Sequence, residues 1–299
     1  MPWENGRKPQ GKSGDSLPSC LPGYSLKRLL KALGLGKSTY EFHARRFREG
    51  SRKDPLEAKI EAVFSGNKGR YGVRRVTAAL RRDGERVNHK KVQRIMHRLA
   101  LKGKTCKKRR PYSSYRGEVG KIAANLLARG FTAEGPDRKF VTDVTEFKLP
   151  DGKLYLSPVM GLYSRRIVGY SISPRPDFAQ IRERMENAFG GREGKVRGAL
   201  FHSDQGWQYQ RKEFGDILEG YGMVQSMSRK DNCHDNSVME NFFGRLKVEM
   251  FYGEEARYSD YGILKKALRD YIAWYNSSRL KEYLHWKSPQ EALSNSGTL

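Results

Sequence analysis

The first third of the chain has apolar residues at helical spacing and no strand pattern. Leucines from Leu26 to Leu33 recur at i, i+3, i+4 and i+7, which predicts a helix that Gly34 and Gly36 end. Two further helices are predicted in YGVRRVTAALRRDG and in the segment after Asn88, whose side chain is placed to cap the second of them. Residues 24–105 therefore predict an all-α region of the helix-turn-helix type.

Beyond residue 130 the pattern changes from helices to strands. KFVTDVTEF, from Lys139 to Phe147, alternates and predicts one strand with Asp143 near its centre, and the Asp-Gly pair after it is typical of a hairpin. Four further strands are predicted in LYLSPVMGLY, RIVGYSIS, GALFHSDQG and MVQSMS, with helices between and after them. Residues 131–255 therefore predict an α/β domain, a mixed five-stranded sheet flanked by helices.

The remaining segments connect or flank these two regions. Residues 1–23 are rich in Gly, Pro, Ser and Lys without periodicity, which predicts a disordered tail, and residues 106–130 predict a basic linker. Residues 256–299 predict a last helix, from Tyr258 to Asn276, and a short tail. No apolar run approaches the ~20 residues of a membrane span, and the N-terminus lacks a signal-peptide pattern, so we expect a soluble cytoplasmic protein.

Positive charge is concentrated in the helical region. Residues 1–130 hold 33 Lys and Arg against 10 Asp and Glu, whereas residues 131–299 hold 25 against 23. Such a one-sided field indicates that the helical half holds a polyanion, although a merely solvated basic surface is the alternative. The helix after Asn88 has a wholly basic outer face that suits the major groove of DNA. The predicted DNA contacts in this region are Arg74, Arg75, His89, Lys90, Lys91 and Arg94.

Three acidic residues stand where active sites form on α/β sheets. Asp143 lies mid-strand, Asp204 lies where an apolar strand ends, and Glu240 lies in the first turns of a later helix, after the basic loop SMSRKDNCHDN. A carboxylate in an apolar strand is costly unless it is paired, and a divalent cation is one such partner. Three carboxylates can hold two Mg²⁺ or Mn²⁺ ions about 4 Å apart around a scissile phosphate.

A structural role is the alternative for each acid taken singly. Asp143 would then pair with an arginine, Asp204 would cap a helix, and Glu240 would be a surface acid. Taken together, on the elements of a nuclease-like sheet, the three favour catalysis. The three cysteines are scattered, so they predict neither a disulfide framework nor a zinc site.

Several motifs carry a resemblance to a known family. They are VTDVTEF around Asp143, FHSDQGWQY around Asp204, SMSRKDNCHDNSVMENFFGRLKVE around Glu240, and the closing segment YNSSRLKEYLHWKSPQEA. Asp204 and Glu240 are separated by the 35 residues that are typical of this family. The chain thus resembles insertion-element transposases with a retroviral-integrase-like DDE catalytic core. More narrowly, it is similar to the second reading frame of bacterial elements whose transposase is encoded in two overlapping frames.

The resemblance implies a ribonuclease-H-like core in which Asp143, Asp204 and Glu240 hold Mg²⁺ or Mn²⁺, two ions in all. It implies cleavage of double-stranded DNA at the element ends, followed by strand transfer into target DNA. It also implies a homo-oligomer on DNA, a first-frame product fused or in trans, and a nucleoid-associated protein of the bacterial cytoplasm. Near Glu240 we further expect Lys230, Asn236 and Lys247 to position phosphates, with Lys247 acting as a point charge.

Two other functions use the same sequence features. A metal-dependent DNA nuclease without transfer activity would need the same three acids. A DNA-binding regulator with a relic catalytic core would keep the basic helical region and would have no need of an intact triad. Because all three acids are present, the sequence favours the transposase.

Overall fold

Contacts within the computed structural model divide the chain into two units, Met1–Glu61 and Ala62–Leu299. The division falls inside a helix, α3 (Pro55–Gly66). The expected disordered tail lies outside the described residues, as do positions 106–121 of the expected linker. The structure describes residues 25–48, 54–105, 122–150, 152–230 and 232–294.

The first unit contains α1 (Leu26–Ala32), α2 (Lys37–Arg48) and the beginning of α3. The helix predicted from the leucine stripe is confirmed as α1, and Gly34 follows it in the left-handed region at a φ of 63°. Leu30 is buried, whereas Leu26 and Leu33 are exposed. The stripe is therefore only partly covered within this unit.

After the end of α3, the second unit continues with two helices joined by a turn, α4 (Val73–Arg82) and α5 (His89–Arg98). Asn88 caps α5 as predicted, because its side chain accepts a hydrogen bond from the backbone N–H of Lys90. Between the helices, Gly84 has a φ of 88°, a conformation that favours glycine. The apolar faces of both helices are buried, which leaves the basic residues of α5 on its outer face.

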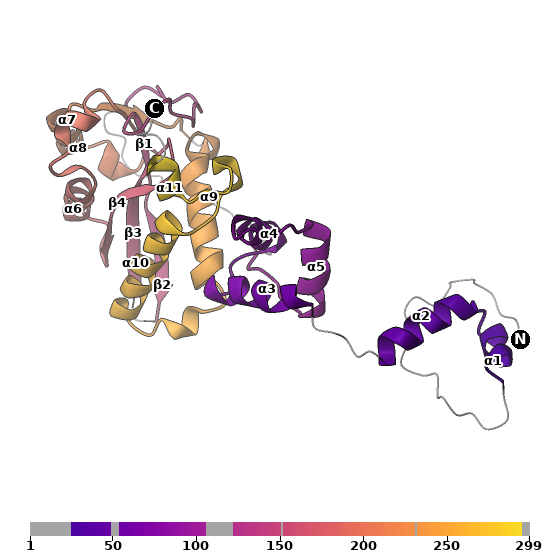
Figure 1. The fold of residues 1–299 in the computed structure, drawn as a ribbon. Coiled ribbons are helices and arrows are strands. Elements are labelled where there is room, and N and C mark those ends of the chain that lie inside the picture. Colours follow the sequence, from indigo (N-terminus) through magenta and orange to yellow (C-terminus); the bar gives the residue numbers. More distant parts are fainter. Residues whose placement is uncertain (1–24, 49–53, 106–121, 151, 231, 295–299) are drawn as a thin grey trace, which may run out of the picture. The chain divides into compact units, whose positions relative to one another are not determined.

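Six strands of the second unit form one mixed sheet (Figure 1). Its hydrogen-bonded order is β2-β3-β1-β5-β6, and β4 pairs with β3. β3 pairs with its neighbours in the antiparallel sense, whereas β1, β5 and β6 are parallel to one another. The strands are β1 (Lys139–Thr142), β2 (Thr145–Leu149), β3 (Gly152–Gly161), β4 (Ile167–Ser173), β5 (Leu200–Ser203) and β6 (Val224–Met227).

The strand that the sequence predicts from Lys139 to Phe147 is broken in two, so the prediction of five strands is wrong by one. β1 and β2 both pair with β3, and the break falls at Asp143 and Val144. There the Asp143 carboxylate accepts a hydrogen bond of 2.7 Å from the backbone N–H of Val144. A side chain that bonds its own neighbouring backbone competes with the sheet ladder, which explains the interruption.

Helices cover both faces of this sheet and enclose an apolar core on each (Figure 1). One core packs β1, β2, β3 and β4 against α9 and α10, and the other packs β1 and β5 against α6 and α8. No helix in the described part of the chain is long and apolar enough to cross a membrane. The helices of the core are α6 (Phe178–Phe189), α7 (Glu193–Val196), α8 (Lys212–Gly220), α9 (Ser237–Leu246), its π-helical continuation Lys247–Phe251, α10 (Tyr261–Ser277) and α11 (Pro289–Ser294).

The last predicted helix begins three residues later than expected. A separate 3-10 turn, Glu255–Arg257, precedes α10, and Asp260 caps the helix by accepting from the backbone N–H of Ile263. The described loops hold three further 3-10 segments, of which Trp207–Tyr209 and Cys233–Asn236 lie next to the elements that carry Asp204 and Glu240.

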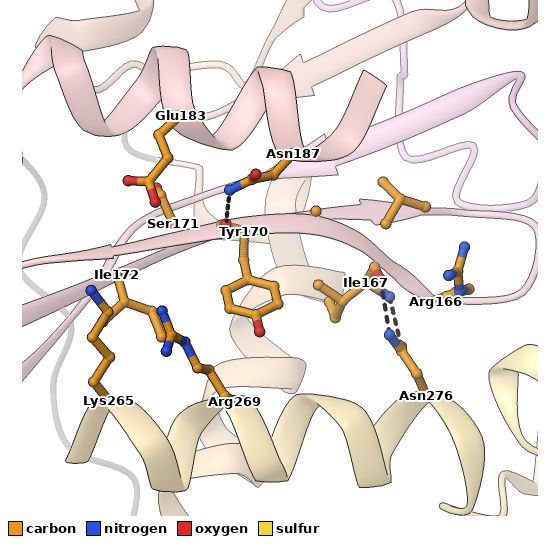
Figure 2. Close-up of a pocket in the computed structure, with 12 residues that line it drawn as sticks. Arg166, Ile167, Tyr170, Ser171, Ile172, Glu183, Asn187, Lys265, Arg269 and Asn276 are labelled. Atoms are coloured by element: carbon orange, nitrogen blue, oxygen red, sulfur yellow. Dashed lines mark hydrogen bonds between the residues drawn. The ribbon is translucent and has the colours of Figure 1, made fainter. Parts of the chain in front are cut away.

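Two asparagines protect the free edge of the sheet at β4. Asn276 of α10 bonds both the backbone N–H and the backbone carbonyl of Ile167, and Asn187 of α6 donates to the carbonyl of Tyr170 (Figure 2). A pocket of about 370 Å³ lies along this edge, between α6 and α10, and Lys265 and Arg269 of α10 extend into it. Because side chains occupy part of its hydrogen-bonding edge, β4 is a poor template for an added strand.

Candidate active site

Asp143 stands at the break between β1 and β2, where the strand turns away from regular pairing. It follows Thr142, whose side chain is buried, and remains partly exposed itself. Burial and the neighbouring charges of Asp204 and Glu240 raise the pKa of Asp143 well above its ordinary value, against the opposing effects of its bond with the Val144 N–H and of Lys247. The site thus holds an acidic group whose negative charge is strongly disfavoured.

Asp204 directly follows β5, the parallel neighbour of β1. Val141 is the register partner of His202, so Asp143 and Asp204 each lie two residues beyond a paired position. The Asp204 carboxylate accepts a hydrogen bond of 3.0 Å from the backbone N–H of Gly206, and burial raises its pKa. The two strands therefore deliver both acids to the same edge of the sheet, where ligand sites of open α/β sheets form.

Glu240 enters from the helix that covers this end of the sheet. α9 packs against β1, and Met239, Phe242 and Leu246 are among its buried residues. Glu240 itself is partly exposed, and its charge is one of those that raise the pKa of Asp143. The three predicted acids thus share one neighbourhood, although they come from separate elements.

The acids are neighbours without forming a closed ligand set. Among the described residues, no three His, Cys, Asp or Glu side chains lie close enough together to hold one metal ion. Neither Asp143 nor Asp204 has an ion-pair partner in the part of the chain that the structure describes. Beside them, the Oδ1 atom of Asn236 is buried without a hydrogen-bond partner among the described residues. The neighbourhood is therefore rich in oxygen donors, and no ion pair in that part of the chain neutralises either aspartate.

A buried arginine that the sequence analysis missed lies beneath the acids. The Nη1 group of Arg184, on α6, donates to the hydroxyls of Thr142, Ser157 and Tyr209. The pKa of Tyr209 is raised by burial and also by the negative charges of Asp204 and Asp143. Arg184 falls at helical spacing among the inward-facing residues of α6, so its position on that face was the available signal.

Three residues near Glu240 were predicted to position phosphates. Lys247 lies beside the acids, with its Nζ 5.2 Å from the ring centroid of Phe147, and its charge lowers the pKa of Asp143. Lys230 is exposed in the loop before α9. Asn236 is only 4% exposed, and its Nδ2 donates to the carbonyl of Thr142 at 3.1 Å. Lys230 is thus exposed and Lys247 is partly exposed, whereas Asn236 is buried and bonded to the backbone of Thr142.

The residues predicted to contact DNA from the helical region fall into two groups. Arg74 pairs with Glu282 at 3.2 Å, and the Nε group of Arg75 donates to the carbonyl of Leu280. Both therefore reach the C-terminal tail. By contrast, His89, Lys90, Lys91 and Arg94 are exposed on the outer face of α5.

Comparison with known protein families assigns most of the second unit. Residues 51–110 match the HTH-like domain, and residues 133–233 and 240–291 match the integrase core domain in two separate segments. The first core segment contains Asp143 and Asp204, and the second begins at Glu240.

Whole-chain comparisons find similar proteins of bacterial insertion sequences. The chain is 44% identical to InsK, assigned as the transposase of insertion sequence element IS150 of Escherichia coli strain K12, over 90% of this chain and 93% of that protein. It is 32% identical to the transposase InsF of insertion sequence IS3A of the same strain, over 90% and 93% respectively. Among solved structures, the HTLV-2 integrase catalytic core domain in complex with magnesium matches with a TM-score of 0.42 at 16% identity, over 53% of this chain and 97% of that one.

Proposed function

The chain belongs to the insertion-sequence transposases, and we propose that it cleaves DNA at element ends and transfers the cut strand through Asp143, Asp204 and Glu240. One observation supports this assignment of residues above the others. Two parallel strands end in acids at one edge of the sheet, a third acid approaches on α9, and their charges act on one another. Like charges gathered in this way are costly for the fold and useful for holding cations.

The side chains at this edge fit a divalent cation. Asp143 and Asp204 are hard oxygen donors without an ion-pair partner among the described residues. We propose that Asp143, Asp204 and Glu240 hold two Mg²⁺ or Mn²⁺ ions. When bound, such ions supply Lewis-acid activation of the attacking oxygen and charge stabilisation of the leaving oxygen. Because the three acids are not within mutual ligand reach, we expect the set to close only when the cation is bound.

The chain's own cationic groups would hold the DNA against these acids. Lys247 is the cation whose charge acts on Asp143, so it is placed to receive a phosphate oxygen as a point charge. Lys230 is exposed in the loop before α9 and would contact the backbone further out. The outer face of α5, with His89, Lys90, Lys91 and Arg94, would bind the element end in the major groove.

The partners of this activity follow from the family. We propose that two or more copies assemble on the paired element ends, since transposition joins two ends to one target. We also propose that a first-frame product, fused or in trans, contributes to assembly. Both partners would bring DNA ends to the acids and would leave the chemistry to Asp143, Asp204 and Glu240.

The decisive experiment is a strand-transfer assay with a pre-cleaved element end. The end carries a labelled 3′-hydroxyl, and the products are counted after incubation with a supercoiled target plasmid in Mg²⁺, in Mn²⁺ or in EDTA. We expect joined products in either metal and none in EDTA. A first-frame product is added in a parallel reaction, so that a missing partner is distinguished from a missing activity.

Two outcomes would contradict the proposal. If an uncut, labelled element-end duplex is cleaved in metal while the pre-cleaved end gives no joined product, with and without the first-frame product, the protein would be a nuclease. DNA binding without cleavage under every metal condition would indicate a regulator with a relic core.

A further inference from the structure

The dipeptide Asp235–Asn236 is bonded to each of the elements that carry an acid of the site. We propose that these two residues are positioning residues, which set the separations of Asp143, Asp204 and Glu240 without touching the reacting atoms. The inference rests on the proposed function, because it assigns a role relative to those three acids.

Asn236 joins the strand that carries Asp143 to the helix that carries Glu240. Its Nδ2 group donates to the carbonyl of Thr142, the residue just before Asp143, at 3.1 Å. Asn236 also stands immediately before α9, four residues ahead of Glu240. A single buried bond therefore spans the two elements, and its loss would free the start of α9 from the end of β1.

Asp235 joins the same turn to the strand that carries Asp204. Its backbone carbonyl lies 3.1 Å from Nε2 of His202, which is two residues before Asp204. A carbonyl only accepts, so Nε2 of His202 carries the proton in this contact. The other ring nitrogen, Nδ1, lies 2.9 Å from the hydroxyl of Ser226 on β6. The turn before α9 is thereby bonded to β5, and through the imidazole to β6.

The carboxylate of Asp235 fixes this turn from the opposite side. It is fully buried and receives hydrogen bonds from the guanidinium groups of Arg229 and Arg129 and from the side-chain amide of Asn125. Hydrogen bonding by Arg229 outweighs the effect of burial, so the pKa of Asp235 is lowered far below its ordinary value. Asp235 is thus a charge-paired anchor, unlike Asp143 and Asp204, which have no ion-pair partner among the described residues.

A phosphate contact by Asn236 is the competing role for the same side chain. Its exposure of 4% and its bond to Thr142 favour the internal role, because a residue that binds DNA backbone has to present its donor outward. The two roles differ in what they change. A phosphate contact contributes to DNA binding with or without metal, whereas a positioning residue acts on the response of the site to metal.

The test compares Asn236→Ala with a matched control, Asn187→Ala. Asn187 makes the same kind of bond, from a side-chain amide to a strand carbonyl at 3.1 Å, but at the β4 edge of the sheet. For each variant we would measure the melting temperature, the affinity for an element-end duplex in EDTA, and the cleavage rate across a Mg²⁺ titration. The Asn236 side chain makes no capping bond to α9, and Asn236→Ser is included because serine can supply one if the alanine variant does not fold.

We expect Asn236→Ala to bind DNA in EDTA within about twofold of the wild type, while its cleavage rate or apparent metal affinity falls by about 10- to 100-fold, as for other groups that orient metal ligands. Asn187→Ala should match the wild type in both. Equal metal responses in Asn236→Ala, Asn236→Ser and the wild type would overturn the inference, as would a loss of DNA affinity in EDTA that accounts for the lost rate. If the wild type itself showed no metal-dependent cleavage, the proposed function would fail instead.

Discussion

The two ends of one continuous helical segment carry acids in opposite electrostatic surroundings. At its beginning, α9 brings the partly exposed Glu240 toward Asp143 and Asp204; these two aspartates have no ion-pair partner among the described residues, and their pKa values are raised. At its other end, the π-helix Lys247–Phe251 carries Glu249, which accepts hydrogen bonds from Arg279 and from the hydroxyl of Tyr271. Burial alone would raise the pKa of Glu249, but Arg279 and Tyr271 outweigh it and lower that pKa.

The difference separates acids that hold the fold together from acids that are available for chemistry. Breaking a buried charge pair leaves an uncompensated charge, so Glu249 and Arg279 depend on each other. Asp143 and Asp204 destabilise the fold in the ionised form unless a cation joins them. A buried carboxylate with an arginine partner is therefore structural here, whereas a partly exposed carboxylate beside other acids, without an ion pair among the described residues, is a candidate for catalysis.

The largest effect is expected at Asp204, near the beginning of α9. Asp204→Asn should lower the cleavage rate by at least about 1,000-fold, or about 4 kcal/mol of transition-state stabilisation, because a charged metal ligand becomes neutral. An asparagine oxygen can still accept from the N–H of Gly206, so the fold should persist. Cleavage of a labelled element-end duplex in Mg²⁺ is the measurement.

Asp137→Asn is the matched control for this change. Asp137 belongs to the same unit, but its carboxylate forms an ion pair of 2.7 Å with Arg192. The Asp137→Asn variant should cleave DNA at a rate within a few-fold of the wild-type rate. A variant at Asp204 that cleaves as well as the one at Asp137 would break the comparison, since pairing would then not distinguish the two kinds of acid.

At the paired end the effect should appear in stability. Glu249→Gln leaves Arg279 buried without its counter-charge, and breaking such a pair costs about 3–5 kcal/mol of the free energy of unfolding. Asp270→Asn, which breaks the exposed pair with Lys266, should cost about 1 kcal/mol or less. Urea unfolding of both variants checks the contrast. Two equal, small changes would show that the pair at Glu249 contributes no more than a surface pair.

Much of this arrangement could be predicted because it depends on local pattern. The capping of α5 by Asn88 involves residues two apart, and the buried face of α9 follows helical spacing. Asp204 was expected at the end of an apolar strand and directly follows β5, whereas Asp143 was expected in mid-strand and stands at a break. These features need only periodicity and the rule that sites form at the carboxyl ends of parallel strands.

The other features of the site and of the basic helices could not be predicted, because they depend on contacts that sequence spacing does not reveal. Asn236 and Lys247 were both expected to position phosphates near Glu240, but Asn236 belongs to a 3-10 turn and Lys247 begins a π-helix, so the helical phase changes at both ends of α9. Likewise, Arg75 bonds Leu280, about two hundred residues further along the chain. The sequence pattern identifies basic residues, but it does not show which of them are hydrogen-bonded to the C-terminal tail.

The pH dependence of stability gives a smaller effect with opposite signs at the two ends. Because the pKa of Asp143 is raised on folding, its contribution to stability is complete below its unfolded value of 3.8 and is lost as pH rises through the folded pKa. Asp143→Asn should therefore gain stability over the wild type as pH rises from 4 to about 7 in EDTA. Glu249, with a lowered pKa, should stabilise above 4.5 and lose that contribution as pH falls.

Urea unfolding of the wild type, Asp143→Asn and Glu249→Gln at several pH values would measure both slopes. Added Mn²⁺ sharpens the contrast. It should make the wild type more stable than Asp143→Asn, and it should leave the stability difference between the wild type and Glu249→Gln unchanged. A difference between Asp143→Asn and the wild type that is constant with pH would mean that Asp143 carries the same charge state in the folded and unfolded chain.

The smallest effect extends the comparison from acids to bases. Lys90 is exposed on α5 and has no ion pair in the part of the chain that the structure describes, whereas Arg75 donates to the carbonyl of Leu280. If free cations bind DNA and engaged ones hold the fold, Lys90→Ala should weaken binding to all DNA sequences alike. It should also reduce the slope of log affinity against log salt by about 1, the value for one lost phosphate contact.

Arg75→Ala should leave that slope unchanged and cost about 1 kcal/mol of stability, through its lost hydrogen bond. Fluorescence anisotropy across a salt series, with thermal melting of each variant, measures both quantities. Equal salt slopes for Lys90→Ala and the wild type would show that the exposed face of α5 does not meet the DNA backbone at this position.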